Sequence, residues 1–548
     1  MTSFEEILKS AGEFGRFQKW LVLLMCIPTF LTAINTFSQV FMGISVPHHC
    51  NTSWIWIIAP NLTKEQQLNL TLPKNGHGSY EECYMYTPVE WDIESIEKYR
   101  LNITEKCRDG WVYDTSEQKS TLITEFDLVC ERKEQHAISQ SVFMAGLLIG
   151  GLVLGPLSDR IGRRPIILLS LLLQLIFGTG AAFVQDFYTY TALRCIMGIG
   201  IAGIFMNNLV LVTEWVGAAQ RAHAAIISHV FFGFGLMALA GLAYLIRNWR
   251  FLLLVGSAPV ALVFCYIWII PESARWLLTQ GKNEKAKKLL QKAASVNKKN
   301  IPEEMLLQLM EEKKSTAGNM LDLFRNKHLR KITLISFYLW FANSLVYYGL
   351  SLNVGSFGLN IYLTQLVFGV VEVLARIQAM FILGRYGRKK CQTACLFLSG
   401  IACLIITVIP KDLPVVTTVL AVIGKLSSAC SFSISYVYAA ELFPTVVRQN
   451  GVGLSSVSAR FGGITAPLIN LLCIYHYAIP MAIYGSSPVI AAALCFLLPE
   501  THNKELQDRT EEAGVIQRSD EAVNGNLMGG NTEQRDDPAA KHIESTIL

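Results

Sequence analysis

The chain has 548 residues, of which 52% are hydrophobic and 16% are charged. Soluble domains carry about 25% charged residues, so this composition excludes a soluble globular protein and indicates a membrane protein. The formal net charge of +5 is too modest to indicate a nucleic-acid partner.

Apolar stretches of about 20 residues predict twelve membrane-spanning helices, six on each side of a long polar segment. The first six stretches are Trp20–Gly43, Ala137–Ser158, Pro165–Val184, Tyr188–Leu211, Ala222–Ile246 and Phe251–Ile270. The second six are Ile332–Leu352, Ile361–Leu383, Cys391–Ile409, Pro414–Tyr438, Val452–Ile474 and Ile479–Leu498. We therefore expect an all-α membrane protein with two six-helix halves.

Lysine and arginine gather in the short loops after the second, fourth, eighth and tenth predicted helices. Short cytoplasmic loops carry this excess, so both termini are expected in the cytoplasm, although Arg247 and Arg250 go against the pattern. The predicted units are a cytoplasmic N-terminus (1–19), an N-terminal half (20–270), a cytoplasmic helical loop (271–331), a C-terminal half (332–498) and a disordered cytoplasmic tail (499–548). The N-terminus lacks a cleavable signal peptide, so the first apolar run is expected to remain as an anchor.

Residues 44–136 form a long polar loop between the first two predicted helices. N-glycans are added in the lumen, so a loop that collects the sequons is expected outside the cell and glycosylated. The N-x-S/T sequons of the chain all fall in this loop, at Asn51, Asn61, Asn69 and Asn102.

The same loop holds four cysteines, and an even number in an oxidising compartment predicts two disulfides with three possible pairings. They are Cys50, Cys83, Cys107 and Cys130. A metal site within Pro47–Cys50 is the weaker alternative, because a disulfide-bonded cysteine is not free to ligate. We expect no metal.

A glycine- and arginine-rich loop occurs twice, first at residues 155–164 and again with Arg385 lying 225 residues after Arg160 (385 − 160). Glu214 and Glu441 repeat at a similar spacing, which indicates two homologous halves that rock around a site at the midplane. The residues expected to act in gating or in structure at these helix ends are Gly155, Asp159, Arg160, Gly162, Arg163, Arg164, Glu214, Arg221, Arg385, Glu441 and Arg448.

Charged residues inside the apolar stretches are the candidate site. Arg460 lies in the middle of the eleventh predicted helix, where an arginine costs about 2.5–3.5 kcal/mol, and no acidic residue lies three or four positions away. Arg376 follows Glu372 by four residues, so the two either pair with each other or leave the arginine for a ligand. Lys425 is a third buried cation. Aromatic residues with fixed cations predict a pocket for small carboxylates.

The polar segments give weaker signals. Residues 283–294 predict a lysine-rich helix, with Leu289 and Leu290 on its apolar side, that lies in solvent or along the inner leaflet rather than against a partner. The chain ends Thr546-Ile547-Leu548, an ending that fits capture by a PDZ-type domain. The sequence lacks G-x-x-x-x-G-K-[S/T], G-x-S-x-G and H-E-x-x-H, so we expect neither an ATP-driven pump nor an enzyme, and no cofactor.

Several motifs together resemble solute carrier family 22, the organic ion transporters of the major facilitator superfamily. They are Phe14–Gln18, Pro47–Cys50, the loop at 155–164, Thr213–Trp215, Pro271–Leu277 and Ala440–Thr445, and the resemblance spans about residues 1–506. It implies a plasma-membrane exchanger of small organic anions such as urate, nicotinate, and other monocarboxylates or dicarboxylates, with an apical epithelial position left open.

The resemblance also implies residue roles. Arg460 occupies a position where the anion transporters carry arginine and the cation transporters carry aspartate. The substrate-binding residues implied are Arg460, Arg376, Trp340, Tyr347, Tyr348, Phe432 and Asn35, with Phe232 at a position where relatives have tyrosine. The alternatives are a carnitine-like zwitterion or organic cation carrier, which Arg460 opposes, and a receptor or scaffold that transports nothing.

Overall fold

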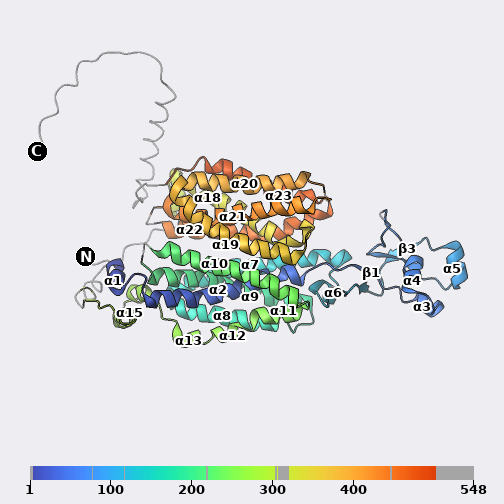
Figure 1. Cartoon of the computed structure of the whole chain (residues 1–548), viewed down its shortest axis with the longest axis horizontal. Helices are drawn as coiled ribbons and strands as arrows, with labels where there is room; N and C mark the ends of the chain where they lie inside the picture. The colour runs from blue at the N-terminus through green and yellow to red at the C-terminus, as the bar shows by residue number, and fades with distance from the viewer. Residues whose placement is uncertain are drawn as a thin grey trace, which may run out of the picture.

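The computed structural model describes residues 4–501, except 77, 117, 218–219, 303–304, 306–319, 411 and 445–446. The predicted tail from residue 502, with its Thr546-Ile547-Leu548 ending, lies outside the described residues. Long helices gather in two bundles that pack side by side, and a smaller domain projects from one end (Figure 1). The opposite end carries α1 (Phe4–Ala11) and α15 (Asn283–Val296), and we call it the α1 end.

Each bundle is built from consecutive long helices. The first contains α2 (Arg16–Met42), α7 (Lys133–Ile161), α8 (Arg163–Gly180), α9 (Phe187–Trp215), α10 (Arg221–Leu245) and the short α11 (Trp249–Ser257), α12 (Val260–Val263) and α13 (Tyr266–Ile269). The second contains α18 (Lys327–Leu352), α19 (Ile361–Tyr386), α20 (Arg388–Val408), α21 (Pro414–Leu442), α22 (Arg448–Asn470) and α23 (Ala478–Cys495). The predicted all-α fold in two six-helix halves is confirmed.

Within the described residues, ten helices are long and apolar enough to cross a membrane. The other two predicted segments differ for physical reasons. The twelve-helix plan placed one helix at Phe251–Ile270, but the structure interrupts it after Ser257, where Pro259 supplies no N–H and bonds from residue i+3 replace the α-helical pattern. The second segment, α18, has 26 residues, but buried polar side chains such as Asn343 and Ser351 lower its mean hydropathy.

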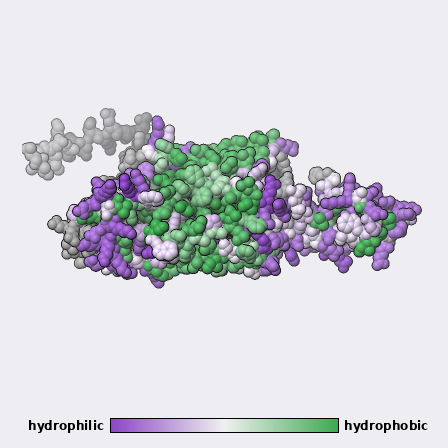
Figure 2. Space-filling view, turned by 60° about the horizontal axis from the view of Figure 1, so that its bottom comes forward, coloured by the Kyte–Doolittle hydropathy of each residue, from purple (hydrophilic) through white to green (hydrophobic). Residues whose placement is uncertain are grey.

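In the view of Figure 2, an apolar band covers the middle of the two bundles, and polar residues collect at both ends of it. Leu262, Trp268, Phe381 and Val408 are apolar side chains of the bundle helices with 78%, 80%, 72% and 78% of their surface exposed. So much apolar surface is stable only against hydrocarbon, because water would cost about 25 cal/mol per Å² of it. The band is the lipid-facing surface.

The projecting domain, residues 44–132, is called the loop domain. It has two antiparallel strand pairs, β1 (His48–Cys50) with β4 (Trp111–Tyr113) and β2 (Tyr84–Tyr86) with β3 (Thr104–Lys106). Its helices are α3 (Ile55–Ile58), α4 (Lys64–Thr71), α5 (Ile93–Tyr99), α6 (Leu122–Phe126) and the 3₁₀ turn η1 (Cys130–Arg132). Of the sequon asparagines, Asn61, Asn69 and Asn102 are exposed and Asn51 is half-buried.

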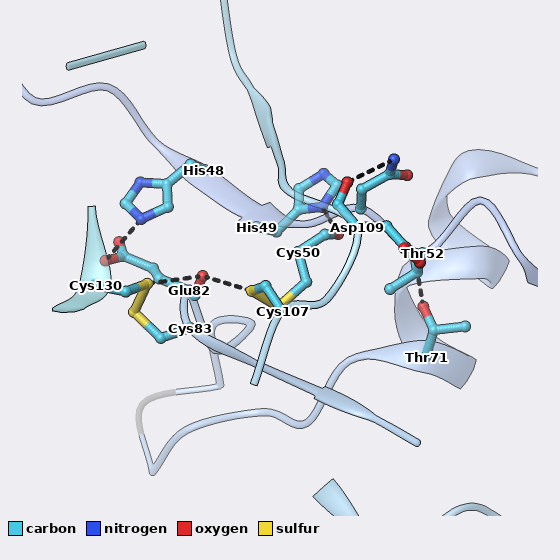
Figure 3. Close-up of a disulfide and its surroundings, with 11 residues drawn as sticks. His48, His49, Cys50, Thr52, Thr71, Glu82, Cys83, Cys107, Asp109 and Cys130 are labelled. Carbon is cyan, nitrogen blue, oxygen red and sulfur yellow. Dashed lines mark hydrogen bonds and ion pairs between the residues drawn. A yellow bond between two sulfur atoms is a disulfide. The ribbon is translucent and has the colours of Figure 1, made fainter. Parts of the chain in front are cut away.

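Two disulfides tie the loop domain together (Figure 3). They join Cys50 to Cys107 and Cys83 to Cys130, a pairing that the sequence left open. His48 lies beside Cys83 and Cys130, but both sulfurs are in the disulfide, so this group offers no thiolate to a metal. The Nδ1 atom of His48 donates to the Val46 carbonyl.

Arg250, which breaks the charge pattern of the short loops, lies against the loop domain. Its guanidinium forms an ion pair with Glu125, and its Nη1 donates to the Ala182 carbonyl at 2.6 Å. Burial raises the pKa of the Glu125 carboxyl, but hydrogen bonds from Arg250 and Trp249 outweigh burial and hold this pKa below its ordinary value. The charge of Arg250 is therefore compensated by Glu125.

At the α1 end, α15 has its apolar face covered by protein. Ala286, Leu290 and Ala293 are buried, and Leu290 and Ala293 pack in one cluster with Ile7 of α1. The following residue, Asn297, accepts from the Phe17 backbone N–H at 2.9 Å and so fixes the start of α2. The apolar side of this helix is therefore buried against protein, while Lys285, Lys288 and Lys292 on its other side are exposed.

Candidate functional site

A cavity of about 90 Å³ lies between the two bundles near the middle of the long helices. Four helices of the first bundle contribute to its wall, namely α2, α7, α9 and α10, and four of the second, namely α18, α19, α21 and α22. A site formed by both halves at the midplane is the arrangement expected for a carrier built from two repeats.

Six of the eight residues expected to bind substrate line this cavity: Arg460, Arg376, Tyr347, Tyr348, Phe432 and Phe232. The other two do not. Trp340 is buried behind the wall and packs edge-on against Tyr436, with the ring centroids 4.5 Å apart. Asn35 is buried between α2 and α11, where its Nδ2 donates to the Gly256 carbonyl at 2.8 Å and its Oδ1 accepts from Ser257.

Glu372 neutralises part of the positive charge behind the wall. Its carboxylate is fully buried, 2.6 Å from the Arg376 guanidinium and 3.4 Å from Lys425 Nζ, and it accepts from the Tyr347 hydroxyl at 3.0 Å. Lys425 also donates to Ser351 and lies over the Tyr347 ring, 3.2 Å from its centroid. Buried charges persist only when paired and hydrogen-bonded, and this cluster meets both conditions.

Arg460 differs from Arg376 and Lys425 in its burial and its partners. It is half-buried in the cavity wall and interacts with the hydroxyl of Tyr348. In the part of the chain that the structure describes, no carboxylate forms an ion pair with it. With Arg376, Lys425 and Arg460 each carrying +1 and Glu372 carrying −1, the cavity and its wall hold a net charge of +2.

Several lining residues were not predicted from the sequence. They are His229, Tyr436, Ser456, Ser344, Thr32 and Thr36. The hydroxyls of Ser344 and Thr32 are buried and have no hydrogen-bond partner in the described structure. A lone histidine or serine in an apolar stretch gives no periodic signal, and only the tertiary fold brings these residues together.

The two halves contribute different chemistry to the cavity. Both arginines of its wall come from the second half, from α19 and α22. The first half contributes mainly apolar side chains, such as Leu147, Ile201 and Phe205, together with the imidazole of His229. Charge recognition therefore belongs to the second half, while both halves contribute apolar and hydrogen-bonding side chains.

The halves meet closely on the loop-domain side of the cavity. Ser141 of α7 donates to the Ile464 carbonyl of α22 at 2.9 Å, and Gln118 donates to the Tyr362 hydroxyl at 2.6 Å. Gly233 of α10 and Gly369 of α19 pack against the opposite helix so tightly that an added Cβ on Gly233 would lie 2.6 Å from Val373. In this conformation the halves are closed at the loop-domain end.

The repeated glycine and arginine loops form matching charge clusters at the α1 end. In the first half, Arg163 makes a double hydrogen bond to Glu214 at 3.1 and 3.0 Å, and Glu272 accepts from the backbone N–H groups of Arg163 and Arg164. Asp159 lies 2.9 Å from the same guanidinium. Gly162 has a φ of +118°, and an added Cβ there would clash with Glu272, so glycine is required.

The second half contains an equivalent cluster, in which some of the partners differ. Arg388 donates to Glu441 at 3.1 and 2.9 Å, and its backbone N–H donates to Glu500 at 2.9 Å. Gly384 stands at the position of Asp159, so this half lacks the third carboxylate (384 − 159 = 225). Thr501 instead donates to Glu441.

The remaining expected gating residues lie at the edges of these clusters. Arg221 is 3.2 Å from Glu5 and donates to the Thr213 carbonyl, and Arg448 donates to the Phe443 carbonyl. Arg160 and Arg385 are exposed, and Arg385 lies over the Tyr386 ring. Gly155 is within α7, with open space beside its Cα.

Known proteins are similar to this chain in sequence and in fold. Residues 91–513 match the family model "Sugar (and other) transporter". Solute carrier family 22 member 13 of Homo sapiens is 48% identical over 100% of both chains. Member 14 of Mus musculus is 41% identical over 93% of this chain and 80% of its own length, and member 6-A of Xenopus laevis is 37% identical over 93% and 94%.

Solved structures agree on the fold. The inward open conformation of the xylose transporter XylE from E. coli has a TM-score of 0.59 and 16% identity, covering 91% of this chain and 99% of its own. Identity this low supports the fold and says nothing of the substrate. The chain therefore belongs to solute carrier family 22 and is a multi-pass membrane protein of the major facilitator superfamily of transporters.

Proposed function

We propose that the chain is a plasma-membrane exchanger of small organic anions that works by alternating access. The observation that carries the proposal is Arg460, a cation in the cavity wall with no carboxylate partner in the described structure. A guanidinium held away from water favours a ligand that supplies the missing negative charge. The net charge of +2 around the cavity supports the same choice.

The geometry argues against an organic cation as the substrate. Among the described residues, none that lines the cavity is acidic. Glu372 lies behind the wall, where Arg376, Lys425 and Tyr347 occupy its oxygens. A cation would meet uncompensated positive charge there. A zwitterion would satisfy Arg460 but would find no carboxylate for its positive end.

The proposed substrates are small organic anions that carry one or two negative groups. Urate, nicotinate, and other monocarboxylates or dicarboxylates fit this description. The aromatic residues Tyr347, Tyr348 and Phe432 supply flat surfaces for a planar ring. The termini are proposed to lie in the cytoplasm and the loop domain outside the cell, with glycans on Asn51, Asn61, Asn69 and Asn102.

Uptake of labelled nicotinate and urate into cells that express the chain tests the proposal. We expect concentrative uptake that unlabelled organic anions inhibit and that a quaternary ammonium cation leaves unchanged. A receptor or scaffold would reach the surface and give no uptake above mock-transfected cells. Inhibition by the ammonium cation alone would instead support a cation carrier.

A further inference from the structure

We propose that His229 makes the carrier selective for anions that also bear an N–H or O–H donor, and this inference rests on the proposed transport of organic anions. His229 lies in α10, in the first half of the chain, and lines the cavity opposite the arginines of the second half. No acidic residue shares the cavity lining, and the remaining polar groups of the wall are hydroxyls and arginines.

The hydrogen bond on one side of the ring fixes what the other side can do. The Nδ1 atom of His229 lies 2.7 Å from the Ala225 carbonyl oxygen. A carbonyl only accepts, so Nδ1 carries the proton and Nε2 of the neutral ring carries a lone pair. Unlike serine and tyrosine hydroxyls, which both donate and accept, this nitrogen can only accept.

His229 lines the cavity and its Nδ1 is committed to the Ala225 carbonyl, so Nε2 is the ring nitrogen left for a ligand. Phe205 packs edge-to-face on the imidazole, with the ring centroids 5.8 Å apart, and holds its plane. The side chain is half-buried, and Nε2 is not one of the buried atoms that lack a partner. Arg376, Arg460 and His229 line the same cavity, so a ligand that pairs with the arginines can reach the imidazole.

The substrate class follows from this arrangement. A ligand that places an N–H or O–H group at Nε2 gains a hydrogen bond, whereas one that places an oxygen or unprotonated nitrogen there sets two lone pairs against each other. Urate carries ring N–H groups and meets the requirement, whereas nicotinate, whose pyridine nitrogen carries a lone pair, does not and is expected to be carried less efficiently than urate. Sites that hydrogen-bond a donor discriminate strongly against analogues that lack it.

Two anions of nearly identical shape test the inference. Pyrrole-2-carboxylate presents a ring N–H beside its carboxylate, and furan-2-carboxylate presents a ring oxygen in the same place. We expect the wild-type carrier to take up the pyrrole anion with about tenfold higher efficiency, as one hydrogen bond and one avoided clash predict. His229→Phe should bring the ratio of the two uptakes to within about twofold.

The controls separate the possible causes. His223→Phe changes an exposed histidine on the same helix and should keep the wild-type ratio. His229→Gln retains an accepting oxygen and should restore part of the preference. The ratio is measured within one variant, so differences in surface expression cancel.

Equal uptake of the two anions by the wild type, or an unchanged ratio in His229→Phe, would overturn the inference while leaving anion transport standing. A preference for the furan anion would also overturn it, because that result requires a protonated, donating imidazole. If the wild type neither carries nor binds either anion, the proposed function itself fails, and the inference fails with it.

Discussion

Arg376 and Arg460 line the same cavity, but within the described structure only Arg376 is paired with a carboxylate. The Arg376 guanidinium lies 2.6 Å from Glu372, and its Nη1 donates to Ser433 at 2.9 Å. Its charge is satisfied before any ligand arrives. A bound anion therefore interacts mainly with the charge of Arg460, which has no carboxylate partner of its own in the described structure.

Arg460→Asp should abolish uptake of labelled nicotinate and urate, because it replaces the unpaired cation by a charge of the same sign as the substrate. Surface biotinylation should show the variant at a level close to that of the wild type. Arg330→Asp is the matched control, since Arg330 is exposed on α18 and far along that helix from the cavity residues. Uptake at the wild-type rate in Arg460→Asp would disprove the assignment of this residue to the site.

Glu372→Gln should destabilise the protein, because it leaves Arg376 and Lys425 buried without their counter-charge. Removing one partner of a buried ion pair costs about 3–5 kcal/mol. The thermal midpoint of the detergent-purified protein should fall, as fluorescence-detected size-exclusion chromatography after heating would measure.

The exposed residue Asp412 provides a control with the same chemical change, Asp412→Asn. Lys425→Met introduced together with Glu372→Gln removes one of the two stranded cations and should recover part of the lost stability. A midpoint equal to that of the wild type in Glu372→Gln would show that water reaches this cluster.

Much of this fold was predictable from the sequence, and the limits have physical causes. Apolar length predicted the long helices, since hydrocarbon thickness fixes how many residues a span needs. The break in the sixth segment had a visible signal in Pro259, which the apolar composition of the stretch concealed. The contact between Lys425 and Glu372 had no signal in the sequence, because 53 residues separate the two (425 − 372) and no local spacing rule joins them.

The candidate site was partly predictable. A charge in a lipid-length stretch is costly enough to stand out, which is how Arg460 and Arg376 were found. Trp340 and Asn35 lie on helices that form the cavity but face away from it, and sequence alone does not give the rotation of a helix that is buried on several sides. His229 gave no such signal, because a neutral histidine in an apolar stretch does not carry the free-energy cost of a buried charge.

The disulfide pairing predicts the phenotypes of cysteine variants. Cys50→Ser and Cys107→Ser should cause the same loss of surface expression, and the double variant should be no worse than either single one. Loss of a native disulfide costs about 2–5 kcal/mol, so a marked trafficking defect is expected. Mass spectrometry of non-reduced peptides should find Cys50 joined to Cys107 and Cys83 joined to Cys130.

Two outcomes would contradict this pairing. One is a peptide in which Cys50 is joined to Cys83 or Cys130. The other is a Cys50→Ser plus Cys107→Ser protein that traffics worse than the single variants, which would mean that each cysteine has a separate partner.

The charge clusters at the α1 end should control turnover rather than affinity. Glu214→Gln and Glu441→Gln each remove a carboxylate that binds an arginine through two hydrogen bonds, and the maximal uptake rate should fall about tenfold while KM changes less than twofold. Asp159→Ala should have a smaller effect of the same kind, since its side chain is 60% exposed and exposed pairs contribute about 0–1 kcal/mol.

Concentration dependence of uptake, normalised to surface protein, separates the two parameters. Lys288→Ala is the control, because Lys288 is exposed on α15 at the same end of the protein. A raised KM with an unchanged maximal rate would show that the cluster acts on substrate binding instead.

The last prediction is that the carrier exchanges anions and returns empty only slowly. To switch between its outward-facing and inward-facing states, the carrier passes through an occluded state in which the cavity is sealed from water on both sides. A bound anion pairs with Arg460 in that state, whereas in the empty carrier the guanidinium has the Tyr348 hydroxyl beside it and no carboxylate partner among the described residues. Leaving a buried charge unpaired costs about 3–5 kcal/mol.

If the whole cost falls on the barrier, the empty return slows by roughly a hundredfold to a few thousandfold, at about 1.4 kcal/mol per tenfold change in rate. Glu372 does not remove this cost, because its carboxylate is committed to Arg376, Lys425 and Tyr347. Efflux of preloaded labelled nicotinate should therefore be slow into anion-free medium and should accelerate when lactate or a dicarboxylate is added outside. As the control, the cells are kept at the same membrane potential and pH in both media. Equal efflux with and without the external anion would mean that the carrier returns empty and that Arg460 does not impose exchange.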